Sequence, residues 1–285
     1  MTNLKIAIQK SGRLSEKSLK ILAECGIHLT NGNRRLVSLS QNFPVEVLYL
    51  RDDDIPQYVN DNVADIGFVG ENVVEEKKRS VKVTERLGFA KCSMSLAIPK
   101  SNDYHDNGFF NGKKIATSYP RILGAYLSEN NIDAEIHEIS GSVEIAPGIG
   151  LADAIFDIVS SGSTLISNGL KEVEVVMRSE AVIIESPRLN EEKRKILDDL
   201  LFRIRAVKAS KNNKYILLNA PNKNLDEIVR LIPGMKSPTI MPLAQEGWSS
   251  VHSVVKENDF WDIIDKIRAL GAQGILVIPI EKMIV

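Results

Sequence analysis

Residues 153–164 read DAIFDIVSSGST: two acids four positions apart, an apolar run, and then small hydroxyl-bearing residues around a glycine. The apolar run is short and ends at Ser160-Ser161-Gly162, which favours a buried strand that ends in a turn. Residues 163–170 then read as a short helix. A strand that passes through a loop into a helix is the repeating unit of α/β proteins. This stretch therefore predicts an α/β fold.

The same alternation continues on both sides of this stretch. Before it, the sequence predicts strands at 4–8, 45–50, 64–70, 92–100, 113–118 and 134–140. Helices are expected from Ser15 to Gly26, near 55–62 and at 119–132. After it, we expect strands at 173–177 and 180–186 and a long helix at 190–209. Short strands that alternate with helices predict mainly parallel sheets with helices on their faces.

The pattern changes after residues 209–214. The remaining chain predicts the order β-α-β-β-α-β, with strands at 215–221, 237–244, 248–255 and 274–280 and helices at 225–233 and 258–272. This order matches the ferredoxin-like fold. We therefore expect three parts: a first lobe of residues 1–100 with 180–211, a second lobe of residues 101–179, and a C-terminal domain of residues 212–285.

Bulk properties limit the partners. The 285 residues carry 36 basic and 37 acidic side chains, so the net charge of −1 offers nucleic acid no general attraction. No segment approaches the roughly 18–20 apolar residues of a membrane span, and the N-terminus has no apolar targeting segment. We expect a cytoplasmic protein with neither nucleic-acid nor membrane partners. Cys25 and Cys92, the only cysteines, are expected to be reduced.

Residues 160–164 predict an anion site beside a pair of acids. The loop and the following helix start offer free backbone N–H groups, and Gly162 lets the backbone approach a ligand closely. Ser161, Ser163 and Thr164 add hydroxyl donors. The acids could bind ribose hydroxyls, or a metal that neutralises pyrophosphate. The combination favours a phosphorylated sugar, and the alternative from spacing alone is a strand with a capped helix and solvated acids.

Other polar clusters also follow predicted strands or begin helices. Lys10 and Arg13 flank Gly12 in QKSGR (9–13), which indicates a polyphosphate site or a solvated turn. Arg51 lies beside three aspartates, and the alternative to a ligand-binding role is an internal ion-pair cluster. Glu144 stands at a helix start, where a carboxylate is also an ordinary cap.

Tyr119 is a further candidate residue. It follows a predicted strand, at a place where its ring could stack on a base. A packing tyrosine is the commoner alternative. None of the four histidines has metal-ligand spacing, and no nucleophile motif occurs in the sequence.

Eight motifs together resemble the long form of the ATP phosphoribosyltransferase family. They are IAIQKSGRLSE (6–16), LRDDDIP (50–56), DIGFVGENV (65–73), IATSYP (115–120), GSVEIAP (141–147), GLADAIFDIVSSGSTLISNGL (150–170), SPTIMPL (237–243) and GILVIPIEKM (274–283). The resemblance implies a two-lobed catalytic core similar to type II periplasmic binding proteins. It also implies an ACT-like C-terminal regulatory domain that binds the inhibitor L-histidine, and a hexamer that can exchange with a dimer.

The resemblance also implies the reaction. In this family N1 of ATP attacks C1 of 5-phosphoribosyl 1-pyrophosphate (PRPP), and pyrophosphate leaves with Mg²⁺. This is the first step of histidine biosynthesis, and it needs no protein nucleophile. Mg²⁺ is expected to be held mainly by the pyrophosphate. The competing interpretation is a non-catalytic two-lobed sensor with an amino-acid-binding tail.

Site residues carry over by position. The family's 5-phosphate loop falls on Ser160, Ser161, Gly162, Ser163 and Thr164. Asp153 is the preferred residue for the ribose hydroxyls, with Asp157 beside it, and Arg51 and Glu144 are expected to face the sugar and pyrophosphate.

The remaining carried-over positions concern the nucleotide and the inhibitor. Lys10, Gly12 and Arg13 are expected to meet the phosphates of ATP, with Tyr119 near the base. Thr239 is the expected contact for regulatory histidine.

Overall fold

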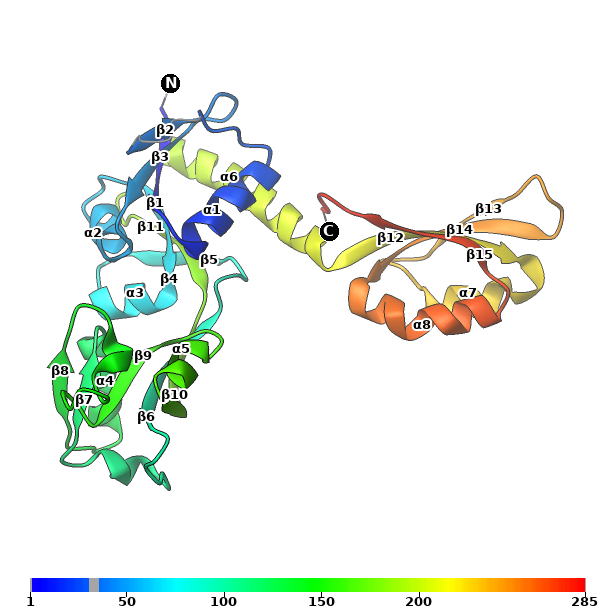
Figure 1. Cartoon of the computed structure of the whole chain (residues 1–285). Helices are drawn as coiled ribbons and strands as arrows, with labels where there is room; N and C mark the ends of the chain where they lie inside the picture. Colours follow the sequence, from blue (N-terminus) through cyan, green and yellow to red (C-terminus); the bar gives the residue numbers. More distant parts are fainter. Residues whose placement is uncertain (1, 31–35, 285) are drawn as a thin grey trace. The chain divides into compact units, whose positions relative to one another are not determined.

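The computed structural model describes residues 2–30 and 36–284, which form three β-sheets with their own helices (Figure 1). The chain divides into two compact units, residues 1–23 with 27–197 and residues 24–26 with 198–285. The first unit contains two sheets, here called the first and second lobes, and the second unit contains one. The α/β class predicted from the sequence is confirmed.

The first lobe is a six-stranded sheet in the order β2-β3-β1-β4-β11-β5. Its strands are β1 (Leu4–Gln9), β2 (Val37–Leu39), β3 (Val45–Leu50), β4 (Ile66–Gly70), β5 (Lys82–Arg86) and β11 (Ala181–Glu185). β1, β3 and β4 are parallel, so their carboxyl ends share one edge. The helices of this lobe are α1 (Arg13–Glu24), α2 (Ile55–Asn60) and α3 (Glu71–Lys77). At Gly67 a Cβ atom would lie 2.5 Å from Ile55, so glycine lets α2 pack closely on the sheet.

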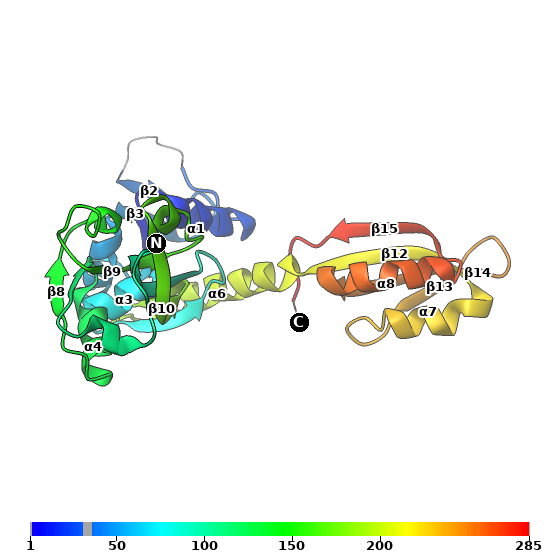
Figure 2. The same cartoon turned by 60° about the horizontal axis from the view of Figure 1, so that its bottom comes forward.

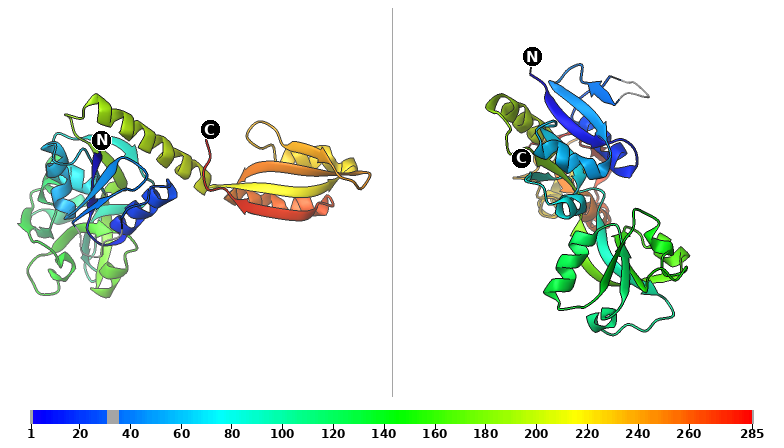
Figure 3. Two further views of the ribbon diagram at one scale, coloured as in Figure 1. Left: turned by 90° about the horizontal axis from the view of Figure 1, so that it is seen from above. Right: turned by 90° about the vertical axis from the view of Figure 1, so that its left-hand side faces the viewer.

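The second lobe is a five-stranded sheet in the order β10-β6-β9-β7-β8. Its strands are β6 (Cys92–Pro99), β7 (Lys114–Thr117), β8 (Glu135–Glu138), β9 (Ala154–Val159) and β10 (Leu170–Ser179). β7, β8 and β9 are parallel. α4 (Pro120–Glu129) covers one face and α5 (Ser163–Ser167) the other, as Figure 3 shows at the right. Apolar side chains fill both faces, which holds the strand ends in place.

Two strand crossings join the lobes. The sequence places residues 92–100 in the first lobe, but β6 hydrogen-bonds to β9 and β10 in the second sheet. The chain therefore leaves the first lobe after β5, ahead of the turn-rich segment at 101–112. It returns between Ser179, the last residue of β10, and Ala181, the first of β11. These two crossings are called the hinge below.

The C-terminal unit has the predicted ferredoxin-like topology. Its antiparallel sheet has the order β13-β14-β12-β15 and consists of β12 (Asn213–Pro221), β13 (Thr239–Pro242), β14 (Trp248–Lys256) and β15 (Gln273–Pro279). Figure 2 shows α7 (Leu225–Leu231) and α8 (Glu257–Ala269) on one face of it. Their apolar sides bury Ile216, Leu218 and Val251.

α6 (Glu191–Lys211) is the longest helix and passes from the first unit into the second. Within residues 2–30 and 36–284, no helix combines the length and the apolar composition needed to cross a membrane.

Candidate active site

The parallel strands of the first lobe bring its cationic residues to one edge. The Lys10 N–H donates to the Leu50 carbonyl at 2.8 Å, so the ends of β1 and β3 stay together. Lys10 and Arg51 therefore leave the sheet side by side, and both are exposed. Gly12 has a φ of +96°, a conformation that glycine adopts at little cost, and it turns the chain into α1 at Arg13. Three cations at the carboxyl edge favour an anionic ligand.

The corresponding edge of the second lobe carries Tyr119, Glu144 and the loop at 160–164. Tyr119 follows β7, Glu144 lies in the short 3-10 helix η3 (Val143–Ile145) after β8, and the loop follows β9. The Ser118 hydroxyl donates to the Ile139 carbonyl at 2.6 Å and so joins the ends of β7 and β8. These three predicted positions come together at one end of the sheet.

The loop at 160–164 presents donors to solvent. Ser160, Ser161, Ser163 and Thr164 are exposed, and the hydroxyls of Ser161 and Ser163 lie 2.9 Å apart. Gly162 has a φ of +73°, a left-handed conformation in which a side chain would be strained. A Cβ there would meet nothing within 4 Å, so the space above the loop is open. Neutral hydroxyl and N–H donors in an open turn suit a phosphate group.

The two acids of the opening motif lie at opposite ends of β9. Asp157 is half-buried two residues before the strand ends, and its carboxylate accepts the Ile158 N–H at 2.7 Å. Asp153 precedes the strand, and the Lys114 N–H donates to it at 2.9 Å. Four residues of strand separate their backbones by about 13 Å. The structure brings Asp157 to the edge that carries the loop and leaves Asp153 at the other edge.

Tyr119 lies where the edges of the two lobes meet. Burial, and the negative charges of Asp157, Asp52 and Asp53, raise the pKa of its phenol. Two of these aspartates follow β3 of the first lobe and one belongs to the second lobe. The side chain of Asn72 on α3 opposes this shift and lowers the pKa of the phenol. Its hydroxyl therefore stays protonated at neutral pH and faces acids from both lobes.

Direct hydrogen bonds join the lobes beside this tyrosine. The buried Glu76 carboxylate of α3 accepts the N–H groups of Arg121 and Ile122, at 3.1 and 3.0 Å. The Asn72 N–H donates to the Ser179 hydroxyl at 3.0 Å, and that hydroxyl lies 3.0 Å from the Asn72 side-chain oxygen. One helix of the first lobe thus holds both the start of α4 and the hinge.

Asp52 is a partly buried carboxylate at this junction. Its Oδ1 atom is buried and has no hydrogen-bond partner. Burial and the neighbouring charge of Asp53 raise its pKa from 3.8 to about 6, against the lowering effect of Lys77. Ionisation of Asp52 therefore destabilises the folded protein at neutral pH when no ligand is bound.

We expect Asp52→Asn to raise the free energy of unfolding by about 1–3 kcal/mol at pH 7.5 and to leave it unchanged near pH 3.5. Because the pKa is higher in the folded state, that state binds the extra proton between about pH 4 and pH 6, and stability falls as the pH rises through this range. Asparagine keeps the neutral shape and removes the penalty above pH 6. Urea unfolding at both pH values measures this, and an equal change at both would contradict it. Asp54→Asn, an exposed neighbour, is the control.

Two carboxylates of the second lobe have the chemistry to meet a divalent cation. Burial, and to a lesser extent the negative charge of Glu144, raise the pKa of Asp157, so the two carboxylates lie within electrostatic reach of each other. Mg²⁺ binds one or two carboxylates when substrate phosphates and water supply the other oxygens. Among the residues that the structure describes, no three His, Cys, Asp or Glu side chains form a metal-binding group by themselves.

Thr239 belongs to the C-terminal unit. It begins β13 and lines a cavity of about 550 Å³ together with Tyr215, Lys236, Ser237 and His252. The Tyr215 hydroxyl lies 2.8 Å from His252 Nδ1. The cavity offers polar groups and an apolar floor, which suits a small amphipathic ligand.

Sequence reasoning missed the residues that join the lobes: Asn72, Glu76, Ser179 and, as a buried acid, Asp52. Asn72 and Glu76 are four residues apart and so share a helix face, but α3 itself was not predicted. Polar residues on the buried side of a short helix were the available signal.

Two family models match the chain. The model described as ATP phosphoribosyltransferase matches residues 51–206, and the model of the HisG C-terminal domain matches residues 210–282. The ATP phosphoribosyltransferase of Cytophaga hutchinsonii is 61% identical over 283 residues, which cover 99% of each chain. The ATP phosphoribosyltransferase of Phocaeicola vulgatus is also 61% identical, over 281 residues and 99% of each chain.

Two solved structures resemble about seven-tenths of the chain. A chain of the ATP phosphoribosyl transferase (HisG:HisZ) complex from Thermotoga maritima matches with a TM-score of 0.62 and 30% identity, over 71% of this chain and 96% of that one. The substrate binding protein of an amino acid ABC transporter matches with a TM-score of 0.50 at 10% identity, over 73% of this chain and 93% of that one. The second likeness concerns the fold alone.

Proposed function

The chain belongs to the ATP phosphoribosyltransferase family, and we propose that its reaction takes place between the two carboxyl edges described above. The enzyme transfers the phosphoribosyl group of PRPP to N1 of ATP, releases pyrophosphate, and so catalyses the first step of histidine biosynthesis. One observation carries the location: Tyr119 lies within electrostatic reach of Asp157 at its own edge and of Asp52 and Asp53 after β3, so the carboxyl edges of the two lobes adjoin there. The cations suit a polyphosphate, and the hydroxyl loop suits the phosphate of the sugar.

PRPP is assigned to the second lobe. The loop residues Ser160 to Thr164 hold the 5-phosphate, and Asp157 accepts hydrogen bonds from the ribose hydroxyls. Its half-buried position two residues before the end of β9 supports this role, whereas the same role for Asp153 would require a ligand that spans the strand. Glu144 faces the same sugar from η3.

ATP is assigned to the first lobe and Tyr119. Lys10 and Arg13, around the Gly12 turn, bind the triphosphate, and Arg51 binds pyrophosphate as it leaves. The neutral Tyr119 ring stacks on the adenine, which turns N1 toward C1 of PRPP. Reaction by displacement needs no nucleophile from the chain, so its rate comes from positioning and electrostatics.

Charge is distributed to favour the transition state. The ribosyl centre becomes electron-deficient as pyrophosphate departs, and the carboxylates of Asp157 and Glu144 stabilise it. Mg²⁺, when bound on the pyrophosphate, neutralises the charge of the leaving group. Metal dependence belongs to the family, and Mg²⁺ is the ion proposed here, with Glu144 and Asp157 as the available protein ligands.

L-Histidine is proposed as the feedback inhibitor, bound in the cavity that Thr239 lines. An amino acid of this size fits about 550 Å³, and the hydroxyls and ring nitrogens there can meet its polar groups. A homohexamer in exchange with a dimer is proposed as the assembly. Its support is the exposed apolar face of the C-terminal sheet, where Met241, Leu276 and Ile278 are 46%, 54% and 43% exposed.

The test of the activity is direct. Purified protein with ATP, PRPP and Mg²⁺ is expected to form phosphoribosyl-ATP, detected by its absorbance change, with pyrophosphatase present to draw the reaction forward. Omission of PRPP is the control. Binding of histidine and PRPP with no product at any enzyme concentration would favour the sensor instead.

A further inference from the structure

The loop at 160–164 has no positive charge of its own. It consists of Ser160, Ser161, Gly162, Ser163 and Thr164, while a sugar phosphate carries a charge of about −1.5 to −2 at neutral pH. The nearest acids of the same edge, Asp157 and Glu144, make the surroundings more negative. Neutral donors can orient a phosphate here, but cations from elsewhere must balance its charge.

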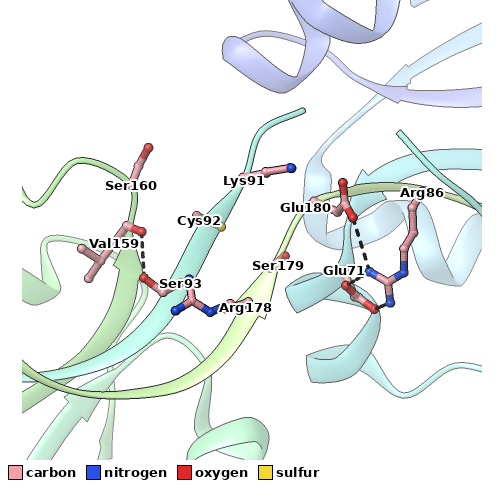
Figure 4. Close-up of a pocket in the computed structure, with 10 residues that line it drawn as sticks. All are labelled: Glu71, Arg86, Lys91, Cys92, Ser93, Val159, Ser160, Arg178, Ser179 and Glu180. Atoms are coloured by element: carbon pink, nitrogen blue, oxygen red, sulfur yellow. Dashed lines mark hydrogen bonds and ion pairs between the residues drawn. The ribbon is translucent and has the colours of Figure 1, made fainter. Parts of the chain in front are cut away.

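A cavity of about 520 Å³ at the hinge adjoins this loop. Ser160, the first loop residue, lines it together with Lys91 from the first crossing and with Ser93 and Arg178 from the adjoining ends of β6 and β10 (Figure 4). The site differs from the cationic edge of the first lobe, because neither Lys10 nor Arg51 lines it. It is open to solvent next to the groups that would hold a phosphate.

Two of the three cationic side chains that line this cavity have no ion-pair partner among the described residues. Arg86 forms hydrogen bonds and ion pairs with Glu71 and Glu180, as the dashed lines in Figure 4 show, so its charge is balanced. Lys91 and Arg178 are exposed, and their side chains make no hydrogen bond or ion pair with any residue in the described ranges. The net charge of the residues that line the cavity is therefore about +1. The two unpaired cations lie between the loop and the ion pairs of Arg86 with Glu71 and Glu180 (Figure 4).

Strand register places Arg178 on the face of the sheet that the loop covers. Arg178 pairs with Ser93 across β10 and β6, and Ser93 pairs with Val159 across β6 and β9. Paired residues point to the same face, so these three form a row that ends one residue before the loop. Two strand spacings separate the backbones of Arg178 and Val159 by about 10 Å. In Figure 4 the Arg178 side chain extends from β10 to Ser93, on the side of β9.

We propose that Arg178 and Lys91 bind the 5-phosphate of PRPP together with the loop at 160–164, so that the hinge supplies the charge that the loop lacks. This proposal rests on the assignment of PRPP to the second lobe. Arg178 has the planar donor pair that matches phosphate oxygens, and Lys91 acts as a point charge. A phosphate bound here would also connect both hinge crossings to the loop.

The experiment measures the binding of ribose 5-phosphate and of ATP, separately, by titration calorimetry. We expect Arg178→Gln and Lys91→Gln each to weaken ribose 5-phosphate about tenfold, and the double variant about a hundredfold, because each removes one charge-assisted contact. The affinity for ATP stays within twofold. Lys171→Gln is the matched control, since it lies on the same strand about 23 Å away, and it keeps wild-type affinity for both ligands.

Two results overturn the proposal: wild-type affinity of the double variant for ribose 5-phosphate, or a loss confined to ATP. Circular dichroism and melting temperature verify that the variants are folded, as expected for exposed side chains. If the wild-type chain turns over ATP and PRPP while the double variant binds normally, this proposal alone fails. A wild-type chain that neither binds ribose 5-phosphate nor forms product overturns the proposed function as well.

Discussion

Replacing Asp157 by asparagine is expected to lower kcat/KM for PRPP about a hundredfold or more, whereas Asp153→Asn leaves it within about threefold. Asp157 is half-buried at the carboxyl edge of the second lobe, and burial raises its pKa, so its charge is poorly screened by water. Asparagine preserves the acceptor for the Ile158 N–H but removes the charge. A charge-assisted hydrogen bond contributes about 1.5–3 kcal/mol, and 2.7 kcal/mol corresponds to a hundredfold change.

The division of this loss between kcat and KM tells what Asp157 does. If it only holds the ribose hydroxyls, KM rises and kcat stays. If its charge also stabilises the electron-deficient ribosyl centre, kcat falls with kcat/KM, and this is the result we expect. Steady-state kinetics with PRPP as the varied substrate measure both parameters.

Asp153 is the matched comparison because it is the other acid of the motif. It accepts the Lys114 N–H at 2.9 Å, a contact that asparagine can retain. Seven residues of extended chain, about 23 Å, separate it from Ser160. The opposite order of effects, with Asp153→Asn the more damaging change, would contradict the assignment of PRPP to the carboxyl edge. It would support the sequence-based prediction that Asp153 binds the ribose hydroxyls.

The strands of the catalytic lobes were predictable because they are buried. β3 has the predicted bounds, Val45–Leu50, and β1 and β9 end within one residue of the expected positions. β5, which was missed, is an exposed strand with the sequence KVTER, so it has no apolar pattern to detect. α3 was missed because it has seven residues and begins directly after β4, with no turn residues between them.

The hinge could not be placed from the sequence, because pairing between distant segments decides it. Residues 92–100 have the apolar pattern of a strand in either lobe. Their partners are Val159 and its neighbours on β9, and Ser179 and its neighbours on β10, which lie between 58 and 87 residues away in the sequence. Local periodicity contains no information on such pairing. The Arg178 and Lys91 cluster depends on the same register and was missed for the same reason.

The candidate site was predictable as a set of loops, and less so as a set of side chains. Parallel strands deliver their exits to one edge, which is why Tyr119, Glu144 and Ser160 come together. Alternation puts both acids of the motif on one face of the strand, but it does not say which of them is near the exit. The length of the strand decides which acid is near the exit. At about 3.3 Å per residue, only Asp157 can reach a ligand on the loop.

Removing residues 212–285 is expected to abolish inhibition by L-histidine while turnover persists. The cut follows Lys211, the last residue of α6, and removes the whole C-terminal sheet with the cavity that Thr239 lines. The ATP phosphoribosyltransferase family model matches residues 51–206, which all precede the cut, so the shortened chain keeps the whole matched region. Velocity against histidine concentration, for the intact and the shortened chain, measures the effect.

A point variant keeps this test independent of the truncation. Thr239→Val has the shape of threonine without its hydroxyl, and we expect it to raise the histidine concentration for half-inhibition about tenfold in the full chain. Asp262→Asn, an exposed change on α8, is the control and leaves inhibition unchanged. Since Thr239 lies in the C-terminal unit, kcat and both KM values should stay at wild-type levels. A shortened chain that remains fully histidine-sensitive would place the inhibitor site within residues 1–211, and wild-type inhibition of Thr239→Val would move it out of this cavity.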